Sequence, residues 1–116
     1  MIDALRAAGF PGVEAEGGVI HARLWSSSVE FTATPEAGLW RLALQWPVRA
    51  TRAQMADWNI AHPETVMDIH LGETRVSMMV DGQNADALYL WAALAEQAVA
   101  HCIRWRRVQR APGEGM

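Results

Sequence analysis

The fold is decided by residues 84–107, NADALYLWAALAEQAVAHCIRWRR, which carry the longest helical pattern in the chain. Asn84 is a good N-cap, and apolar side chains follow at spacings of three and four residues, which places them on one face of a helix. This apolar face comprises Leu88, Trp91, Leu94, Ala95, Ala98 and Cys102, and the charged residues Asp86, Glu96, Arg104 and Arg107 lie opposite. We therefore predict a long C-terminal helix that covers one face of a sheet.

The sheet is predicted from five segments that are rich in β-branched and aromatic residues and are separated by turn sequences. The clearest is 39–46, LWRLALQW, in which apolar residues alternate with others, as expected when one sheet face is covered and the other is wet. Gly72-Glu73 joins the last two strands in a connection that fits a tight hairpin. The predicted strands are Val19–Trp25, Val29–Thr34, Leu39–Trp46, Thr65–Leu71 and Thr74–Val80.

Two shorter helices complete the predicted order. The first covers residues 2–9, and the second begins after Thr51, which stands at capping-box spacing from Gln54. The sequence thus predicts an α+β fold in the order α-βββ-α-ββ-α, with a mostly antiparallel five-stranded sheet. We expect one domain over residues 1–110 and a flexible tail over residues 111–116.

The C-terminal helix is expected to be longer than the sheet it covers. A helix over residues 84–107 would rise about 36 Å, whereas strands of six or seven residues span about 20–24 Å. The end from Ile103 to Arg110 should therefore project past the core or pack on a partner.

Composition excludes several classes of protein. The chain has 116 residues, a net charge of −3 and one cysteine, Cys102, which argues against a nucleic-acid-binding protein and rules out a disulfide within the chain. No apolar run reaches the roughly 18–20 residues of a membrane span, and Asp3 stands where a signal peptide would be basic. We expect a cytoplasmic protein that does not contact the membrane.

No pattern of catalytic or metal-binding residues is found in the sequence. The four histidines lack the spacing that would place two imidazoles on one face, and Asp68 with His70 supplies too few ligands for zinc. His101 and Cys102 are neighbours on a helix, so their side chains point about 100° apart. No glycine-rich loop precedes a helix as phosphate binding requires. We predict no enzyme activity, no metal and no cofactor.

Six tryptophans are many for a chain of this length. Trp40 and Trp46 share the predicted covered face of the sheet, and Trp91 lies on the covering helix, so these three are assigned to the core. Trp25, Trp58 and Trp105 are less easily placed inside, and large aromatic side chains at a surface mark binding sites. The predicted interface residues are Trp25, Trp58, Asn59, Trp105, Arg106 and Arg107.

The segment Met55-Ala56-Asp57-Trp58-Asn59, ahead of a hairpin and a long apolar helix, resembles the YbjN-like proteins. These are bacterial domains whose fold is similar to that of type III secretion chaperones. In that family a helix with a Trp-Asn or similar pair follows the third strand, and Trp58 and Asn59 match that pair. The chain departs from the family at Ile60-Ala61-His62-Pro63, where an Arg-containing stretch usually leads into the next strand. The resemblance implies no established catalytic activity but a regulatory or chaperone-like binding role, often in a dimer.

The leading hypothesis is a small bacterial module that binds another protein or itself through the second helix, the adjoining strand and the overhanging helix end. An alternative is a small-molecule-binding protein or enzyme with a pocket between the sheet and the C-terminal helix. That pocket would be lined by Trp40, Met79 and Trp91, with polar groups from Asp68, His70 or His101. RNA or DNA contact through the arginine-rich tail is the third hypothesis.

Overall fold

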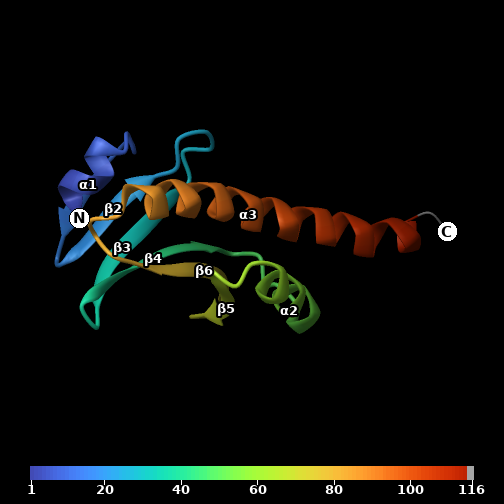
Figure 1. Ribbon diagram of the computed structural model, residues 1–116. Helices are drawn as coiled ribbons and strands as arrows, with labels where there is room; N and C mark the ends of the chain where they lie inside the picture. Colours follow the sequence, from blue (N-terminus) through green and yellow to red (C-terminus); the bar gives the residue numbers. More distant parts are fainter. Residues whose placement is uncertain (115–116) are drawn as a thin grey trace.

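The structure is a computed structural model that describes the backbone of residues 1–114 and the side chains of residues 1–104. It is an α+β fold in which an open sheet lies under a long C-terminal helix (Figure 1). The elements are α1 (Ile2–Ala7), β1 (Glu14–Glu16), β2 (Val19–Arg23), β3 (Glu30–Glu36), β4 (Leu39–Trp46), α2 (Arg52–Ala61), β5 (Val66–His70), β6 (Glu73–Val80) and α3 (Ala85–Glu114).

The described sheet has six strands in the order β1-β2-β3-β4-β6-β5, and all neighbouring strands are antiparallel. The α+β class is confirmed, but the prediction of five strands is wrong. The strand that was missed is β1, whose three residues are all exposed and therefore show no apolar alternation. Gly17 and Gly18, both at positive φ, connect it to β2, which is the backbone that a two-residue hairpin turn requires.

The hairpin between β5 and β6 turns one residue earlier than the sequence predicts. Leu71 and Gly72 occupy the turn with φ of 52° and 80°, and Glu73 already belongs to β6. Glycine adopts such angles freely, whereas leucine does so only under strain. The position of the turn could not be predicted from the sequence, because leucine is an unusual first residue for a two-residue hairpin turn.

The core lies between α3 and one face of the sheet. Leu42 and Leu44 of β4 are buried there, Trp40 and Trp46 are partly buried, and Trp91 of α3 is completely buried. This confirms that the period of two in residues 39–46 marks a half-covered strand. In the part of the chain that the structure describes, no helix covers the other face of the sheet (Figure 1).

The N-terminal caps of α2 and α3 follow the predicted chemistry. The Thr51 Oγ1 accepts a hydrogen bond from the Gln54 N–H at 3.1 Å, and the Gln54 Oε1 accepts one from the Thr51 N–H at 2.8 Å. At the start of α3, the Asn84 Oδ1 accepts a hydrogen bond from the Ala87 N–H at 3.3 Å. Both helix starts could thus be predicted from local sequence.

The overhang of α3 is also confirmed (Figure 1). The helix has 30 residues, about 45 Å at 1.5 Å per residue, and it gives the molecule a long axis of 53 Å against 26 Å in the other two directions. It ends at Glu114 instead of near Arg107, and residues 115–116 of the predicted tail lie outside the described part. Among the described helices, none has the length and apolar character needed to cross a bilayer.

Candidate functional site

Trp58 is not at the surface, contrary to the prediction. Only 2% of its surface is exposed. Its Nε1 donates a hydrogen bond to the Thr65 Oγ1 at 2.9 Å, and the rings of His62 and His101 lie 3.9 Å and 5.6 Å away, centroid to centroid. The indole could not be placed from sequence because its burial depends on α3 crossing α2 at His101. Trp58 joins α2 to the core and offers no contact surface in this state.

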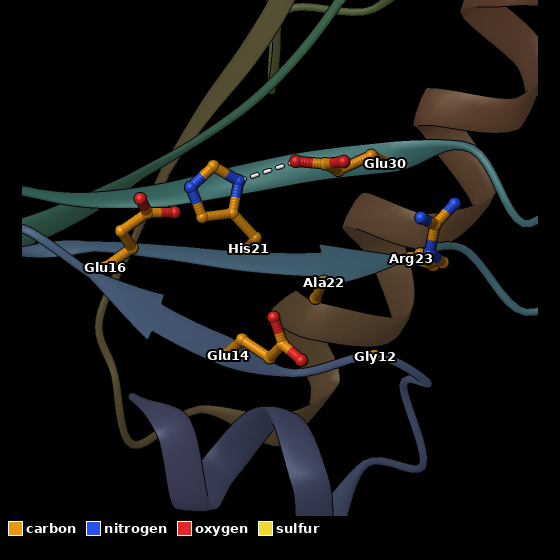
Figure 2. A pocket seen from close by; sticks show the side chains of 7 residues that line it. All are labelled: Gly12, Glu14, Glu16, His21, Ala22, Arg23 and Glu30. Atoms are coloured by element: carbon orange, nitrogen blue, oxygen red, sulfur yellow. Dashed lines mark hydrogen bonds and ion pairs between the residues drawn. The ribbon is translucent and has the colours of Figure 1, made fainter.

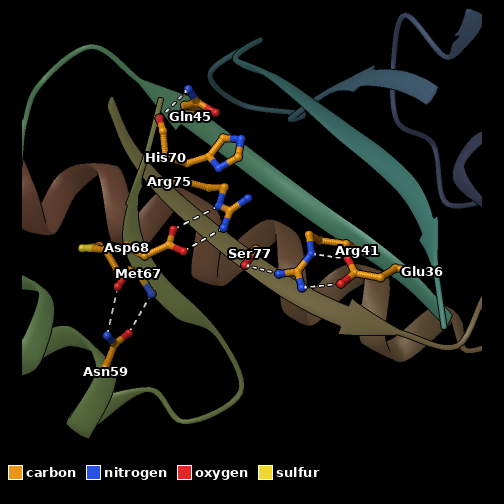
Figure 3. Close-up of polar contacts among 9 residues, drawn as sticks. All are labelled: Glu36, Arg41, Gln45, Asn59, Met67, Asp68, His70, Arg75 and Ser77. Carbon is orange, nitrogen blue, oxygen red and sulfur yellow. Dashed lines mark hydrogen bonds and ion pairs between the residues drawn. The ribbon is translucent and has the colours of Figure 1, made fainter. Parts of the chain in front are cut away.

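Asn59 also serves the fold (Figure 3). Its Nδ2 donates to the Met67 carbonyl at 3.0 Å, and its Oδ1 accepts from the Met67 N–H at 2.7 Å. Met67 lies in β5, an edge strand, and these two backbone groups are the ones that do not pair with β6. The Asn59 amide therefore takes the place of a neighbouring strand at this edge, a protection that edge strands need.

Trp25, in contrast, lies at the surface as predicted, with 42% of its area exposed. Its ring stacks on Phe10 at 4.5 Å with an interplanar angle of 8° and lies 5.5 Å from the Tyr89 ring of α3. The loop after Trp25 is tied to the same helix, because the Ser26 and Ser27 hydroxyls donate to the Glu96 Oε1 at 3.0 Å and 2.9 Å. Trp25 is thus a fixed aromatic platform beside α3.

The exposed side of α3 carries further large apolar residues that the sequence interpretation did not single out as a group. Tyr89, Leu90 and Ile103 are 48%, 42% and 46% exposed. Tyr89 and Leu90 could have been found from a helical wheel, since both lie outside the apolar face assigned to the core. We call these three residues and Trp25 the α3 surface: Tyr89 lies beside the Trp25 ring, Leu90 follows Tyr89 in the sequence, and Ile103 lies about 20 Å further along the helix. Three of the predicted interface residues, Trp105, Arg106 and Arg107, lie beyond the side chains that the structure describes.

An apolar pocket of about 230 Å³ lies where β4 ends beneath α3. Its lining is Val29, Leu44, Trp46, Pro47, Val48, Val99, Cys102 and Ile103. A pocket between sheet and helix is therefore present, but its lining includes none of the residues predicted for it. Trp91 is fully buried in the core, and Met79 lies on the open face of the sheet, opposite to Trp40 in orientation, because adjacent strand residues alternate.

The open sheet face carries side chains that are joined in pairs (Figure 3). Arg75 binds Asp68 through two hydrogen bonds of 3.0 Å and 2.7 Å, and Arg41 binds Glu36 at 2.5 Å and 2.9 Å. The hydrogen bond from Arg41 lowers the pKa of Glu36, and the same contact raises the pKa of Arg41. Asp68 is thus held in an ion pair and does not converge with His70 on a site.

A shallow hollow of about 310 Å³ lies at the other end of this face (Figure 2). The His21 Nδ1 is 2.5 Å from the Glu30 Oε1, while Glu14 and Glu16 of the edge strand line the rim and Arg23 bonds the Ser28 carbonyl. Among the described residues, no three His, Cys, Asp or Glu side chains are placed to hold a metal ion. The hollow has acidic walls without a convergent set of ligands.

Cys102 belongs to the core, as predicted. It is 1% exposed, its Sγ lies 4.0 Å from the Met67 Sδ, and burial raises the pKa of its thiol. A raised pKa keeps the thiol protonated, whereas a nucleophilic cysteine needs the thiolate. His101 points elsewhere, with its Nε2 3.6 Å from the Asp57 Oδ2. These two residues do not form a nucleophile and base.

No family model matches the chain, and neither does any curated protein or solved structure. The resemblance to the YbjN-like proteins stays a prediction.

Proposed function

We propose that this chain is a cytoplasmic protein-binding module, with a regulatory or chaperone-like role, whose contact surface is the α3 surface. The observation that carries the proposal is the exposure of Tyr89, Leu90 and Ile103 on α3 and of Trp25 in the loop between β2 and β3, each between 42% and 48%. Aromatic and large aliphatic side chains gathered on a rigid element are typical of interfaces between proteins.

The rigidity of the patch supports this proposal. Trp25 is held by its stack on Phe10, and its loop is bound to Glu96 on α3. A side chain that is already ordered loses less entropy when a partner binds. The proposed contact surface keeps Trp25 from the predicted one and replaces α2 by α3, since Trp58 of α2 is buried.

The test compares two substitutions of exposed apolar residues on different helices. Leu90→Glu lies within the α3 surface, and Ile60→Glu, at a residue 84% exposed on α2, is the matched control. Both variants should keep the wild-type melting temperature. Partners captured by the wild-type chain from its native host should be lost with Leu90→Glu and kept with Ile60→Glu. Equal capture by all three chains would refute the proposal.

A second candidate function is the binding of an apolar small molecule in the pocket beneath α3. The observation in its favour is a lining made only of apolar residues. It ranks second because the pocket, at about 230 Å³, is smaller than most ligand sites and lacks the polar groups that orient a ligand. A panel of fatty acids should raise the melting temperature of the wild type and not of Val99→Trp, which fills the pocket. Absence of a shift in the wild type would eliminate this candidate.

A further inference from the structure

A stripe of six residues runs along the side of α3 that faces away from the sheet. Its members follow one another at spacings of four and three residues, and five are exposed while Ala100 is half-buried. They are Asp86, Leu90, Ala93, Gln97, Ala100 and Arg104. A repeat of four and three is the pattern by which two helices pack side by side. The α3 stripe has this repeat although α3 uses its opposite side for its own core.

We propose that the α3 stripe pairs with the same stripe of a second copy of this chain, antiparallel, about a two-fold axis near Ala95. The inference rests on the proposed function and names the partner. Charge selects this arrangement: Asp86 and Arg104 each lie nine positions from Ala95. The two-fold axis thus brings Asp86 of each copy beside Arg104 of the other. A parallel pair would bring like charges together at both ends, which is unfavourable.

The middle of the stripe suits a close approach of two helices. About the same axis, Leu90 of one copy meets Ala100 of the other, and Ala93 meets Gln97. Each contact sets a larger side chain against a small one, which lets side chains interdigitate. Asp86 and Arg104 are both exposed, so the pairing requires no rearrangement of the core.

The same two-fold axis also brings the second copy beside the side of the α3 stripe that carries Tyr89. Tyr89 lies beside the Trp25 ring and Ile103 lines the pocket at the end of β4. At 100° per residue both fall on the same flank of the α3 stripe, and a two-fold axis keeps equivalent flanks on the same side of the pair. Tyr89 then falls within two positions of Ile103 of the second copy, about 3 Å along the helix. Leu90 thus lies within the contact, and the exposed Tyr89 and Trp25 lie on its flank.

A charge-reversal cycle tests the register. The wild type, Asp86→Arg, Arg104→Asp and the double variant are compared by sedimentation equilibrium. The wild type should be a dimer. Each single reversal should weaken the dimer by about tenfold or more, because it places like charges together twice, and the double variant should restore it to within about threefold. The circular dichroism spectra show whether all four chains are folded.

The outcomes separate this inference from the proposed function. A monomeric wild type overturns the pairing, while loss of a captured partner with Leu90→Glu would still support a protein-binding module. The antiparallel register would be overturned if the wild type is a dimer but the affinity lost in the double variant equals the sum of the losses in the two single variants. Cysteines placed at Ala93 and Gln97 give a second readout, because in this register oxidation should yield a covalent dimer. A cysteine at Ile60 is the control and should not give one.

Discussion

The pair Trp58 and Asn59 shows how two adjacent polar groups can join a helix to an edge strand. Trp58 reaches Thr65, just before β5, and Asn59 binds both backbone groups of Met67 within it. Both residues were predicted to contact a partner. The local sequence could not show that these side chains bind this chain's own residues, because the contact forms only when the chain reverses direction after Pro63 and places β5 beside α2.

The Asn59 contact makes a quantitative prediction. Asn59→Ala removes two hydrogen bonds and leaves the Met67 N–H without its acceptor, so the free energy of unfolding should fall by about 1–3 kcal/mol. Urea denaturation measures this change. Ile60→Ala, at the next and largely exposed residue, should cost less than about 0.5 kcal/mol. Equal losses in the two variants would show that the amide does not stabilise β5.

Trp58 makes a related prediction. Thr65→Val keeps the shape of the side chain but removes the acceptor of the buried indole N–H, and should lower the free energy of unfolding by about 1–3 kcal/mol. The Trp58→Phe variant has no indole N–H. Adding Thr65→Val to it should therefore lower the free energy of unfolding clearly less than Thr65→Val lowers it in the wild type. Urea denaturation of the two single variants and the double variant measures this coupling. Additive losses would contradict a hydrogen bond that matters for stability.

Glu36 predicts the pH dependence of stability. Its folded pKa lies below the ordinary value of 4.5 because Arg41 donates hydrogen bonds to it. The contribution of the pair is therefore present above this value and is lost as the pH falls through the folded pKa. The difference in melting temperature between the wild type and Glu36→Gln should be largest near neutral pH and shrink as the pH falls below the ordinary value. A difference that does not change with pH would contradict this role of the carboxylate.

At the scale of the element, the hairpin between β5 and β6 stores strain that a substitution can release. Leu71 has a φ of 52° and is 86% exposed, so its side chain gains little from packing. Asparagine tolerates the left-handed region far better, and Asn-Gly is a preferred hairpin turn. Leu71→Asn should raise the free energy of unfolding by about 1 kcal/mol. Leu71→Ala, which keeps a Cβ without the polar side chain, should not raise the free energy of unfolding. Thermal melts of the two variants measure the difference.

The elements that could be predicted from sequence are those with a signal inside the element. β4 shows a period of two over eight residues, and α2 and α3 begin with caps that the structure forms. β1 has neither signal, because its three residues are exposed and only its pairing with β2 makes it a strand. The candidate site depends on contacts across the fold, and the stack of Phe10 on Trp25 has no trace in the spacing of the two residues.

At the scale of the whole molecule, the long axis comes from α3 alone. The last buried side chain described on this helix is that of Cys102, and the helix continues to Glu114. Among the side chains that the structure describes, the core on α3 thus ends at Cys102, while the backbone of the helix runs on past the sheet (Figure 1). An isolated helical segment of about ten residues is marginal in water, so residues 105–114 add little to the stability of one chain.

Truncation after Arg104 separates the fold from the overhang. A chain that ends there should lose helical ellipticity at 222 nm but keep the urea midpoint of the full chain, because the buried face of α3 from Leu88 to Cys102 is intact. Truncation after Gln97 is the contrasting variant: it removes Ala98 and Cys102 from the core and should lower the free energy of unfolding by more than about 3 kcal/mol. The α3 stripe ends at Arg104, so the first truncation should also keep the dimer. Loss of the dimer at an unchanged urea midpoint would instead move the contact to Trp105, Arg106 and Arg107.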